Sequence, residues 1–234
     1  ASKIIIRDFG EIENLQVSSK GPRDFVTKTD IMVEKILIEE LSRSKRNYSF
    51  VTEESGKVIN SNKDIYWVID PIDGTINFMH GIPHFAISIG LMIDGKLESG
   101  LIFDPIKNEI FYAEKNNGAF FNNHRIRVSK KNDLNECLFV TGGKLNREIE
   151  LPYRKSGCAA LDMAYVASGR YDGYFQNNLN LWDIAAGIIL IKEAGGFVNF
   201  FDVDKINTLK KNIIASNSNI HEEFASLINK KDIE

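Results

Sequence analysis

The stretch Asp-Pro-Ile-Asp-Gly-Thr at 70–75 carries the residue types with the clearest chemistry in this chain. An apolar run at 65–69 predicts a buried strand that delivers Asp70 at its carboxyl end, where open α/β sheets place their sites. Asp73 follows closely, so a tight turn can aim both carboxylates at one point. Two such carboxylates repel each other unless a positive charge lies between them. Oxygen ligands with no nearby Cys or His favour Mg²⁺ over Zn²⁺.

The residues after the second carboxylate suit a phosphate group. Gly74 lets the backbone approach a ligand closely. If a helix starts at Thr75, its free N–H groups suit an anion. The local pattern alone leaves a simpler interpretation open, because Asp-Pro and Asp-Gly are common turn dipeptides.

Three further acidic residues could join this pair. Asp183 lies near the start of a helix predicted over 182–194, and Glu53 follows a short apolar strand near 48–52. Asp30 begins a helix whose apolar residues recur at helical spacing. Each residue has an ordinary alternative, since Asp30 and Asp183 are good helix caps and Glu53 could be a solvated loop charge. Taken singly, none of the three establishes a site.

Apolar spacing predicts the elements that position these residues. We expect a loop over 18–28, followed by a helix capped by Thr29 or Asp30. From 85 to 128 the pattern has period two, and Asp94-Gly95 predicts a tight hairpin turn. The expected strands lie near 48–52, 65–69, 85–93, 96–103, 109–113, 119–121, 173–176, 197–201 and 212–215. The other expected helices lie near 1–9, 159–168, 182–194 and 219–230.

A β-rich first part followed by an α/β second part predicts a layered α/β protein. We divide the chain into an N-terminal α+β part, 1–140, and a C-terminal α/β part, 141–234, which together form one compact catalytic unit. The boundary is expected between 129 and 153. A chain of 234 residues is long enough to bury a sizeable core.

Composition narrows the function classes. The net charge of −3 argues against a broad nucleic-acid surface. Two cysteines without a CxxC pattern indicate a reducing compartment, the cytoplasm, and no disulfide framework. No apolar run reaches the roughly 18 residues of a membrane-spanning helix. No Ser-His-Asp or Cys-His nucleophile motif is present, and the four histidines are expected in loops or at the surface.

Three motifs in order resemble the inositol monophosphatase family, within the wider lithium-sensitive Mg²⁺-dependent phosphatases. The family pattern D-P-[ILV]-D-G-T-x-N-F matches 70–78, and W-D-x-A-[AG]-G matches 182–187. A Lys-containing loop leading to D-x-V-T-x-x-D matches Lys20 and 24–30, and Glu-Glu-Ser at 53–55 also fits. The resemblance covers almost the whole chain.

This resemblance implies a fold, a cofactor and a reaction. The family fold is a layered α-β-α-β-α sandwich, usually a homodimer. Its members use two or three Mg²⁺ ions to hydrolyse a small phosphate monoester with metal-activated water. The implied substrate is myo-inositol 1-phosphate, and lithium is the implied inhibitor. Neither a membrane nor a directly bound nucleic acid is expected as a partner.

The resemblance also implies the metal ligands. Glu53, Asp70 and the backbone carbonyl of Ile72 would hold one ion. Asp70, Asp73 and Asp183 would hold a second. Glu53 would help to hold a loosely bound third ion through water.

Catalytic and substrate-binding roles follow from the same resemblance. Asp30 and Thr75, with Glu53 as the third catalytic residue, would position and activate the attacking water. The amides of Gly74 and Thr75 would hold the phosphate. The implied substrate-binding residues are Asp73, Gly74, Thr75, Gly157, Cys158, Gln176 and Asp183.

Two positions depart from the family pattern. Gln176 stands where the family commonly has a Glu that hydrogen-bonds the substrate's hydroxyls. An amide can donate and accept, but it lacks the charge that strengthens a bond to a hydroxyl. Cys158 stands where many members carry Ser or Thr, and a small buried side chain is the simplest interpretation. These departures bear on the choice of ester more than on phosphatase chemistry.

Other functions stay open at this stage. The same chemistry could act on fructose 1,6-bisphosphate, 3′-phosphoadenosine 5′-phosphate or histidinol phosphate, which neighbouring families use. A function of another class is a binding factor in a transcription complex, as for some bacterial members. The acidic pI of 5.9 gives no support for direct RNA binding.

Overall fold

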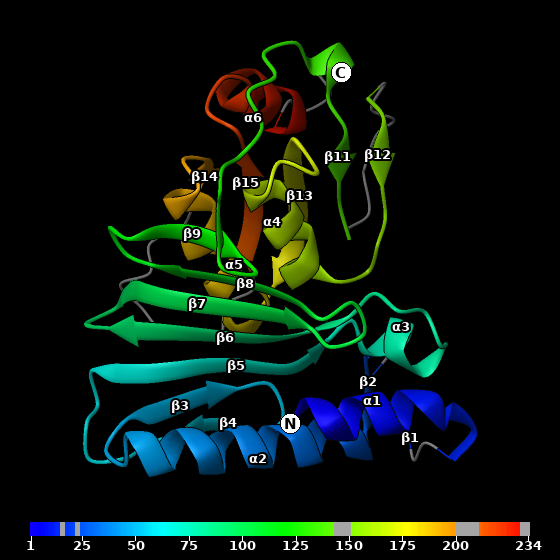
Figure 1. Ribbon diagram of the computed structural model, residues 1–234, viewed down its shortest axis with the longest axis vertical. Coiled ribbons are helices and arrows are strands. Elements are labelled where there is room, and N and C mark those ends of the chain that lie inside the picture. The colour runs from blue at the N-terminus through cyan, green and yellow to red at the C-terminus, as the bar shows by residue number, and fades with distance from the viewer. Residues whose placement is uncertain (15–16, 22–23, 143–150, 200–210, 230–234) are drawn as a thin grey trace.

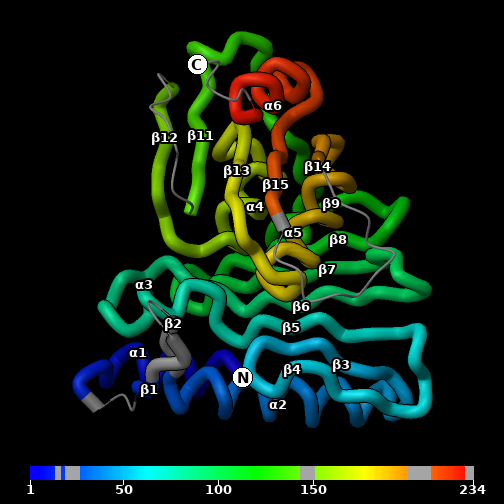
Figure 2. The backbone as a smooth tube through the Cα atoms, turned by 180° about the vertical axis from the view of Figure 1, so that it is seen from behind, coloured from blue at the N-terminus to red at the C-terminus, as the bar shows by residue number. Residues whose placement is uncertain are grey.

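The computed structural model describes residues 1–14, 17–21, 24–142, 151–199 and 211–229 of the chain. Helices and sheets alternate in layers, with the N-terminal helices and the C-terminal helix at opposite ends (Figures 1 and 2). The helical layers contain α1 (Ser2–Gly10) with α2 (Lys28–Ser44), α4 (Ala159–Ala167) with α5 (Leu181–Glu193), and α6 (His221–Asn229). This arrangement confirms the expected α-β-α-β-α sandwich.

The larger sheet has eight strands in the order β10-β9-β8-β7-β6-β5-β3-β4. Its neighbours pair antiparallel except β3 and β5, which are parallel. Its strands are β3 (Ser49–Thr52), β4 (Gly56–Val58), β5 (Ile65–Asp73), β6 (Ala86–Ile93), β7 (Lys96–Asp104), β8 (Glu109–Glu114), β9 (Gly118–Phe121) and β10 (His124–Ile126). The short helix α3 (Thr75–Met79) follows β5 directly.

The smaller sheet has five strands in the order β12-β11-β13-β15-β14. β11 pairs parallel with both β12 and β13, whereas β15 pairs antiparallel with β13 and β14. Its strands are β11 (Phe139–Val140), β12 (Tyr153–Arg154), β13 (Gly173–Leu179), β14 (Phe197–Asn199) and β15 (Lys211–Ser216). Short 3-10 helices cover Ile12–Asn14 and Leu134–Glu136. The division of the chain at residue 140 stays a prediction.

The predicted hairpin is confirmed. Asp94 and Gly95 connect β6 to β7 with φ angles of 50° and 74°. Left-handed backbone at both central residues is the tight turn whose twist matches that of paired strands. It sets the register in which Ile93 lies opposite Lys96 and Met92 opposite Leu97.

The prediction of a loop over 18–28 was wrong. β1 (Val17–Gly21) pairs antiparallel with β2 (Asp24–Thr27), a ribbon that pairs backbone groups without needing apolar alternation. The expected cap of the next helix was also wrong. Thr27 caps α2, and Asp30 completes the capping box because its Oδ2 accepts from Thr27 N at 2.9 Å.

The expectation of loop or surface histidines was wrong for His221. It begins α6 and is 7% exposed. Its Nδ1 lies 2.8 Å from Ser216 Oγ, and its Nε2 lies 2.9 Å from Asn199 Oδ1. These bonds explain how an imidazole can be buried here, and burial lowers the pKa of His221. Among the helices that the structure describes, none has the length and apolar character to cross a membrane.

Helix α5 lies between the two sheets and is buried on all sides at its centre, as an apolar helix without a polar face must be. Gly90 of β6 and Gly100 of β7 lie opposite each other beneath it. A Cβ at Gly100 would lie 2.7 Å from Ala186 Cα and 2.6 Å from Ile189 Cγ2. The missing side chains therefore allow α5 to approach the larger sheet closely.

We expect Gly100→Ala to destabilise the fold by about 1–3 kcal/mol, because the added methyl group would clash with the backbone of α5, and shifting that buried helix disrupts its packing. Thermal and urea unfolding of the metal-free protein would measure this. Gly10→Ala is the matched control, since a Cβ at Gly10 meets nothing within 4 Å. Equal stability of the two variants would show that close helix–sheet contact does not constrain the fold.

Candidate active site

Two parallel strands lie side by side at the centre of the candidate site. Thr52, the last residue of β3, pairs with Ile69 of β5, so the next residues, Glu53 and Asp70, lie next to each other. The prediction of a strand that ends at 69 was wrong, because β5 continues through Pro71 to Asp73 with a register shift in its pairing with β6. The amide of Glu53 donates to the carbonyl of Ile69 at 3.2 Å. Asp70 is 2% exposed, and its Oδ1 accepts from the Ile72 amide at 3.0 Å. The two carboxylates predicted from the sequence therefore lie together.

Helix α5 brings Asp183 to the same place. Asp70 pairs with Ser88 of β6, and the Ser88 hydroxyl donates to the carbonyl of Trp182 at 3.3 Å. Asp183 is part of the capping box of α5, where its Oδ2 accepts from Asn180 N at 2.7 Å. Asn180 caps α5, so the alternative of Asp183 as the cap itself was wrong, as for Asp30 in α2; Asp183 completes the capping box, which is compatible with a place beside Asp70.

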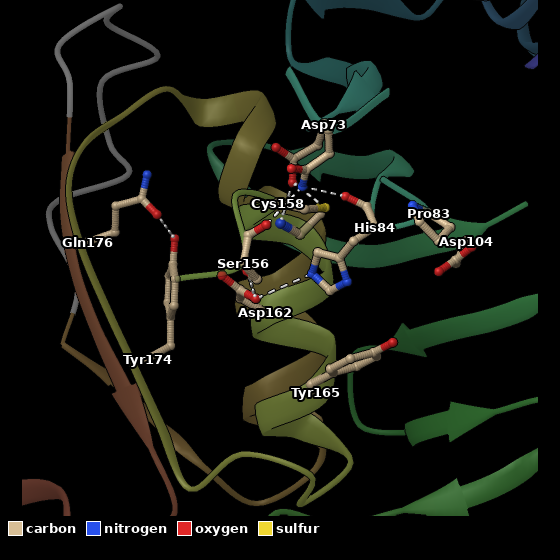
Figure 3. Close-up of polar contacts among 12 residues, drawn as sticks. Asp73, Pro83, His84, Asp104, Ser156, Cys158, Asp162, Tyr165, Tyr174 and Gln176 are labelled. Atoms are coloured by element: carbon tan, nitrogen blue, oxygen red, sulfur yellow. Dashed lines mark hydrogen bonds and ion pairs between the residues drawn. The ribbon is translucent and has the colours of Figure 1, made fainter. Parts of the chain in front are cut away.

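Asp73 faces the first turn of α4 (Figure 3). Its Oδ2 accepts from the Ala160 amide at 2.5 Å and from Cys158 Sγ at 3.1 Å. Gly74 follows with a φ of 97°, and a Cβ there would lie 3.1 Å from the carbonyl oxygen of His84. In this structure, the absence of a side chain at Gly74 therefore allows close contact with the backbone of His84 rather than with a ligand.

The charges of these carboxylates oppose one another. Burial raises the pKa of Asp70 well above its usual value, and the charges of Glu53, Asp73 and Asp183 raise it further. Burial also raises the pKa of Asp73 to about 6, against the hydrogen bond from Ala160, which lowers it. Ionised together, these groups destabilise the folded protein unless a cation compensates them.

The donor set fits a hard cation such as Mg²⁺. The side chains whose charges raise the pKa of Asp70 most, after burial itself, are the carboxylates of Glu53, Asp73 and Asp183, and oxygen donors are those that Mg²⁺ prefers. Within the described ranges, no three His, Cys, Asp or Glu side chains are already arranged to enclose a metal ion. The match therefore rests on charge and donor type rather than on ligand distances.

A hydroxyl and a buried carboxylate lie next to the cluster. Thr75 Oγ1 lies 3.3 Å from Asp30 Oδ1 and 3.1 Å from the carbonyl oxygen of Ile72. Asp30 is fully buried at the start of α2, and burial raises the pKa of its carboxyl. Because one hydroxyl proton serves one acceptor at a time, this group can switch between the carboxylate and the carbonyl.

The other predicted site residues lie on the side of α4 and β13. Gly157 has a φ of 84° and packs against Asn77. Cys158 is buried, as expected, and burial raises the pKa of its thiol well above its usual value. Gln176 contacts Tyr174 rather than the carboxylates (Figure 3). The side chain of Lys20 and residues 143–150 lie outside the described structure.

The sequence analysis missed a buried glutamate that fixes the turn around Glu53. Both oxygens of the Glu34 carboxylate accept hydrogen bonds, from the amides of Glu54 at 2.8 Å and Ser55 at 2.9 Å. Glu34 is 1% exposed on α2. Its signal in the sequence was an acidic residue beside Val33 on the apolar face of a predicted helix.

A second missed group joins the α3 region to α4 (Figure 3). Asn77 Nδ2 donates to the carbonyl oxygens of His84 and Ser156, each at 2.8 Å. Asp162 is fully buried, accepts from the Ser156 hydroxyl, and lies 3.7 Å from His84 Nε2. Burial raises the pKa of Asp162, and the nearby imidazole of His84 and the hydrogen bond from Ser156 oppose that shift. This group holds the turn that places Cys158 against Asp73.

Comparison with known proteins places this arrangement in a family. The model of the inositol monophosphatase family matches residues 1–232. The chain belongs to the inositol monophosphatase family. It is 40% identical to an inositol-1-monophosphatase of Caulobacter vibrioides, over 96% of this chain and 94% of that one.

Other members of the family carry a different name. A Nus factor SuhB of Escherichia coli is 38% identical, over 99% of this chain and 92% of that one. A crystal structure of the extragenic suppressor protein suhB from Bartonella henselae is 42% identical, with a TM-score of 0.91 over 98% of this chain and 94% of that one. The fold and the phosphatase family are therefore shown, whereas the names of relatives differ.

We expect Asp70→Asn to raise the melting temperature in EDTA, because it removes one of several mutually repelling buried charges. Each pKa unit of relieved repulsion corresponds to about 1.4 kcal/mol. The same variant should gain less stability than the wild type when Mg²⁺ is added, because it has lost a ligand. Scanning calorimetry with EDTA and with Mg²⁺ would measure both effects. A melting temperature that falls in EDTA with an unchanged response to Mg²⁺ would contradict the assignment.

Proposed function

We propose that this protein hydrolyses a small phosphate monoester with Mg²⁺ and water. The observation that carries the proposal is the group of carboxylates around Asp70, whose charges destabilise the folded chain without a cation. Phosphoryl transfer needs positioning and positive charge more than a covalent nucleophile. Membership of the inositol monophosphatase family supports the same reaction class.

The residues that would hold Mg²⁺ come from three elements. Glu53 follows β3, Asp70, Ile72 and Asp73 belong to β5, and Asp183 lies in α5. Two or three ions are proposed, with Ile72 contributing its carbonyl. When bound, Mg²⁺ supplies charge that neutralises phosphoryl oxygens and lowers the pKa of water.

Asp30 and Thr75 are proposed to orient the attacking water. The Thr75 hydroxyl can donate a hydrogen bond to Asp30 and accept one from a water molecule. The pair can therefore orient that water at the phosphate, with Asp30 as the proton acceptor. Glu53 would contribute beside them. The amides of Gly74 and Thr75, at the start of α3, are proposed to hold phosphate oxygens together with the Asp73 side of the site.

The proposed substrate is myo-inositol 1-phosphate, and fructose 1,6-bisphosphate, 3′-phosphoadenosine 5′-phosphate and histidinol phosphate are alternatives. We propose that the enzyme is a cytoplasmic homodimer and that lithium inhibits it. Relatives named Nus factor SuhB favour a second candidate, association with a transcription complex. Retention of RNA polymerase by an immobilised Asp70→Asn variant would support that candidate, since the variant has lost a metal ligand.

Phosphate release from these four esters, with Mg²⁺ and with EDTA, tests the proposed reaction. We expect release that depends on Mg²⁺ from at least one ester, with the inositol ester first. Release that is equal in EDTA would contradict a metal-dependent reaction. Absence of release from all four esters, in a folded protein that binds Mg²⁺, would favour the transcription-complex candidate.

We expect Thr75→Ala to lower kcat by about 10²–10⁴-fold while Mg²⁺ still stabilises the protein, because the hydroxyl serves proton transfer rather than the metal. Steady-state kinetics and a Mg²⁺ melting series would check both parts. Thr75→Ser is the control, since it keeps the hydroxyl. Wild-type turnover in Thr75→Ala would show that Thr75 and Asp30 do not act on the water.

A further inference from the structure

A buried phenol lies on β13, close to the amide of Gln176. Tyr174 is fully buried on β13, and its hydroxyl donates to Gln176 Oε1 at 2.8 Å (Figure 3). A buried O–H group needs an acceptor, and an amide nitrogen cannot accept. The bond therefore fixes which end of the Gln176 amide faces the phenol.

The same side chain is confined from a second direction. β11 and β13 are parallel, and Gly142 follows the end of β11. A Cβ at Gly142 would lie 2.2 Å from Gln176 Oε1 and 2.9 Å from its Nε2. A glycine at 142 thus leaves just enough room for the amide, and any larger residue would displace it.

The confined amide lies on the strand that leads to the candidate active site. Parallel strands place ligands at their carboxyl ends, and the chain continues from the end of β13 to Asp183 at the start of α5. Burial raises the pKa of the Tyr174 hydroxyl well above its usual value, and the charges of Asp162, Asp73 and Asp183 raise it further. Gln176 is half-buried at this edge, so its nitrogen can meet a bound molecule.

This orientation has a chemical consequence. With Oε1 engaged by the phenol, the amide offers only N–H donors to a substrate. A carboxylate at this position would instead accept protons from hydroxyls and repel an anion. An amide held in this way favours an oxygen that accepts, above all the oxygen of an anionic group.

We propose that Tyr174 is a positioning residue that holds the Gln176 amide nitrogen toward the substrate. Compared with a carboxylate at position 176, the pair shifts the preference of the site toward phosphate esters that carry a second phosphate. The inference rests on the proposed function for the site, and it concerns the choice among the proposed esters.

The test compares fructose 1,6-bisphosphate with myo-inositol 1-phosphate on one set of variants. Dissociation constants are measured by calorimetry with Ca²⁺ in place of Mg²⁺, because Ca²⁺ also takes oxygen ligands. We expect Gln176→Glu to lower the preference for the bisphosphate by about tenfold or more, through added repulsion. Asn177→Asp is the matched control, since it adds the same charge at an exposed neighbouring residue.

Tyr174→Phe tests the positioning role. It removes the bond that orients the amide, so the preference for the bisphosphate should fall while Gln176 is present. In a Gln176→Glu background the same change should have no further effect on the preference, and a double-mutant cycle measures this coupling. A variant that only loosens the fold would weaken both esters alike and show no such coupling.

Three results would overturn the inference. The first is an unchanged preference in Gln176→Glu, and the second is an equal shift in Asn177→Asp. The third is additivity of Tyr174→Phe and Gln176→Glu. Phosphate release with Mg²⁺ is measured separately on the same proteins, so loss of the proposed reaction and loss of the ester preference are distinguished.

Discussion

Mutual repulsion among buried carboxylates is the interaction on which this site depends. Asp70 is buried within β5, and its burial and the charges of Glu53, Asp73 and Asp183 all raise its pKa. Bringing such carboxylates together on folding destabilises the folded protein. A bound cation that interacts with the same charges compensates this repulsion. The hydrogen bonds to Asp73 and Asp183 hold these two side chains and limit how far they can turn away from Asp70.

The rest of the fold supplies the positions. Parallel pairing of β3 with β5 places Glu53 beside Asp70, and the small residues Gly90 and Gly100 let α5 approach the sheet that carries them. Ser88 then joins the strand to the first turn of α5 through the carbonyl of Trp182. Segments that lie far apart in the sequence therefore meet beside Asp70, because α5 lies between the two sheets and contacts both.

Local pattern predicted most of the elements, because β5, the Asp94-Gly95 hairpin and α5 have clear apolar spacing or turn chemistry. For the site, local pattern alone indicated the pair Asp70 and Asp73; the roles of the other site residues came from the family resemblance and stay predictions. It did not predict the ribbon of β1 and β2, whose pairing depends on backbone groups rather than on apolar alternation. It also missed contacts between segments far apart in the chain, such as Asn77 with Ser156. Periodicity reports which face of an element is buried, and it carries no information on which distant group that face will meet.

The most direct measurement is a crystal structure of the protein soaked with Mn²⁺, which takes oxygen ligands as Mg²⁺ does and gives an anomalous signal. The account predicts anomalous peaks enclosed by the carboxylates of Glu53, Asp70, Asp73 and Asp183, with loss of a peak in Asp70→Asn. Peaks confined to other surfaces, or no peak at the end of β5 in well-ordered crystals, would contradict a metal-dependent phosphatase built on this cluster.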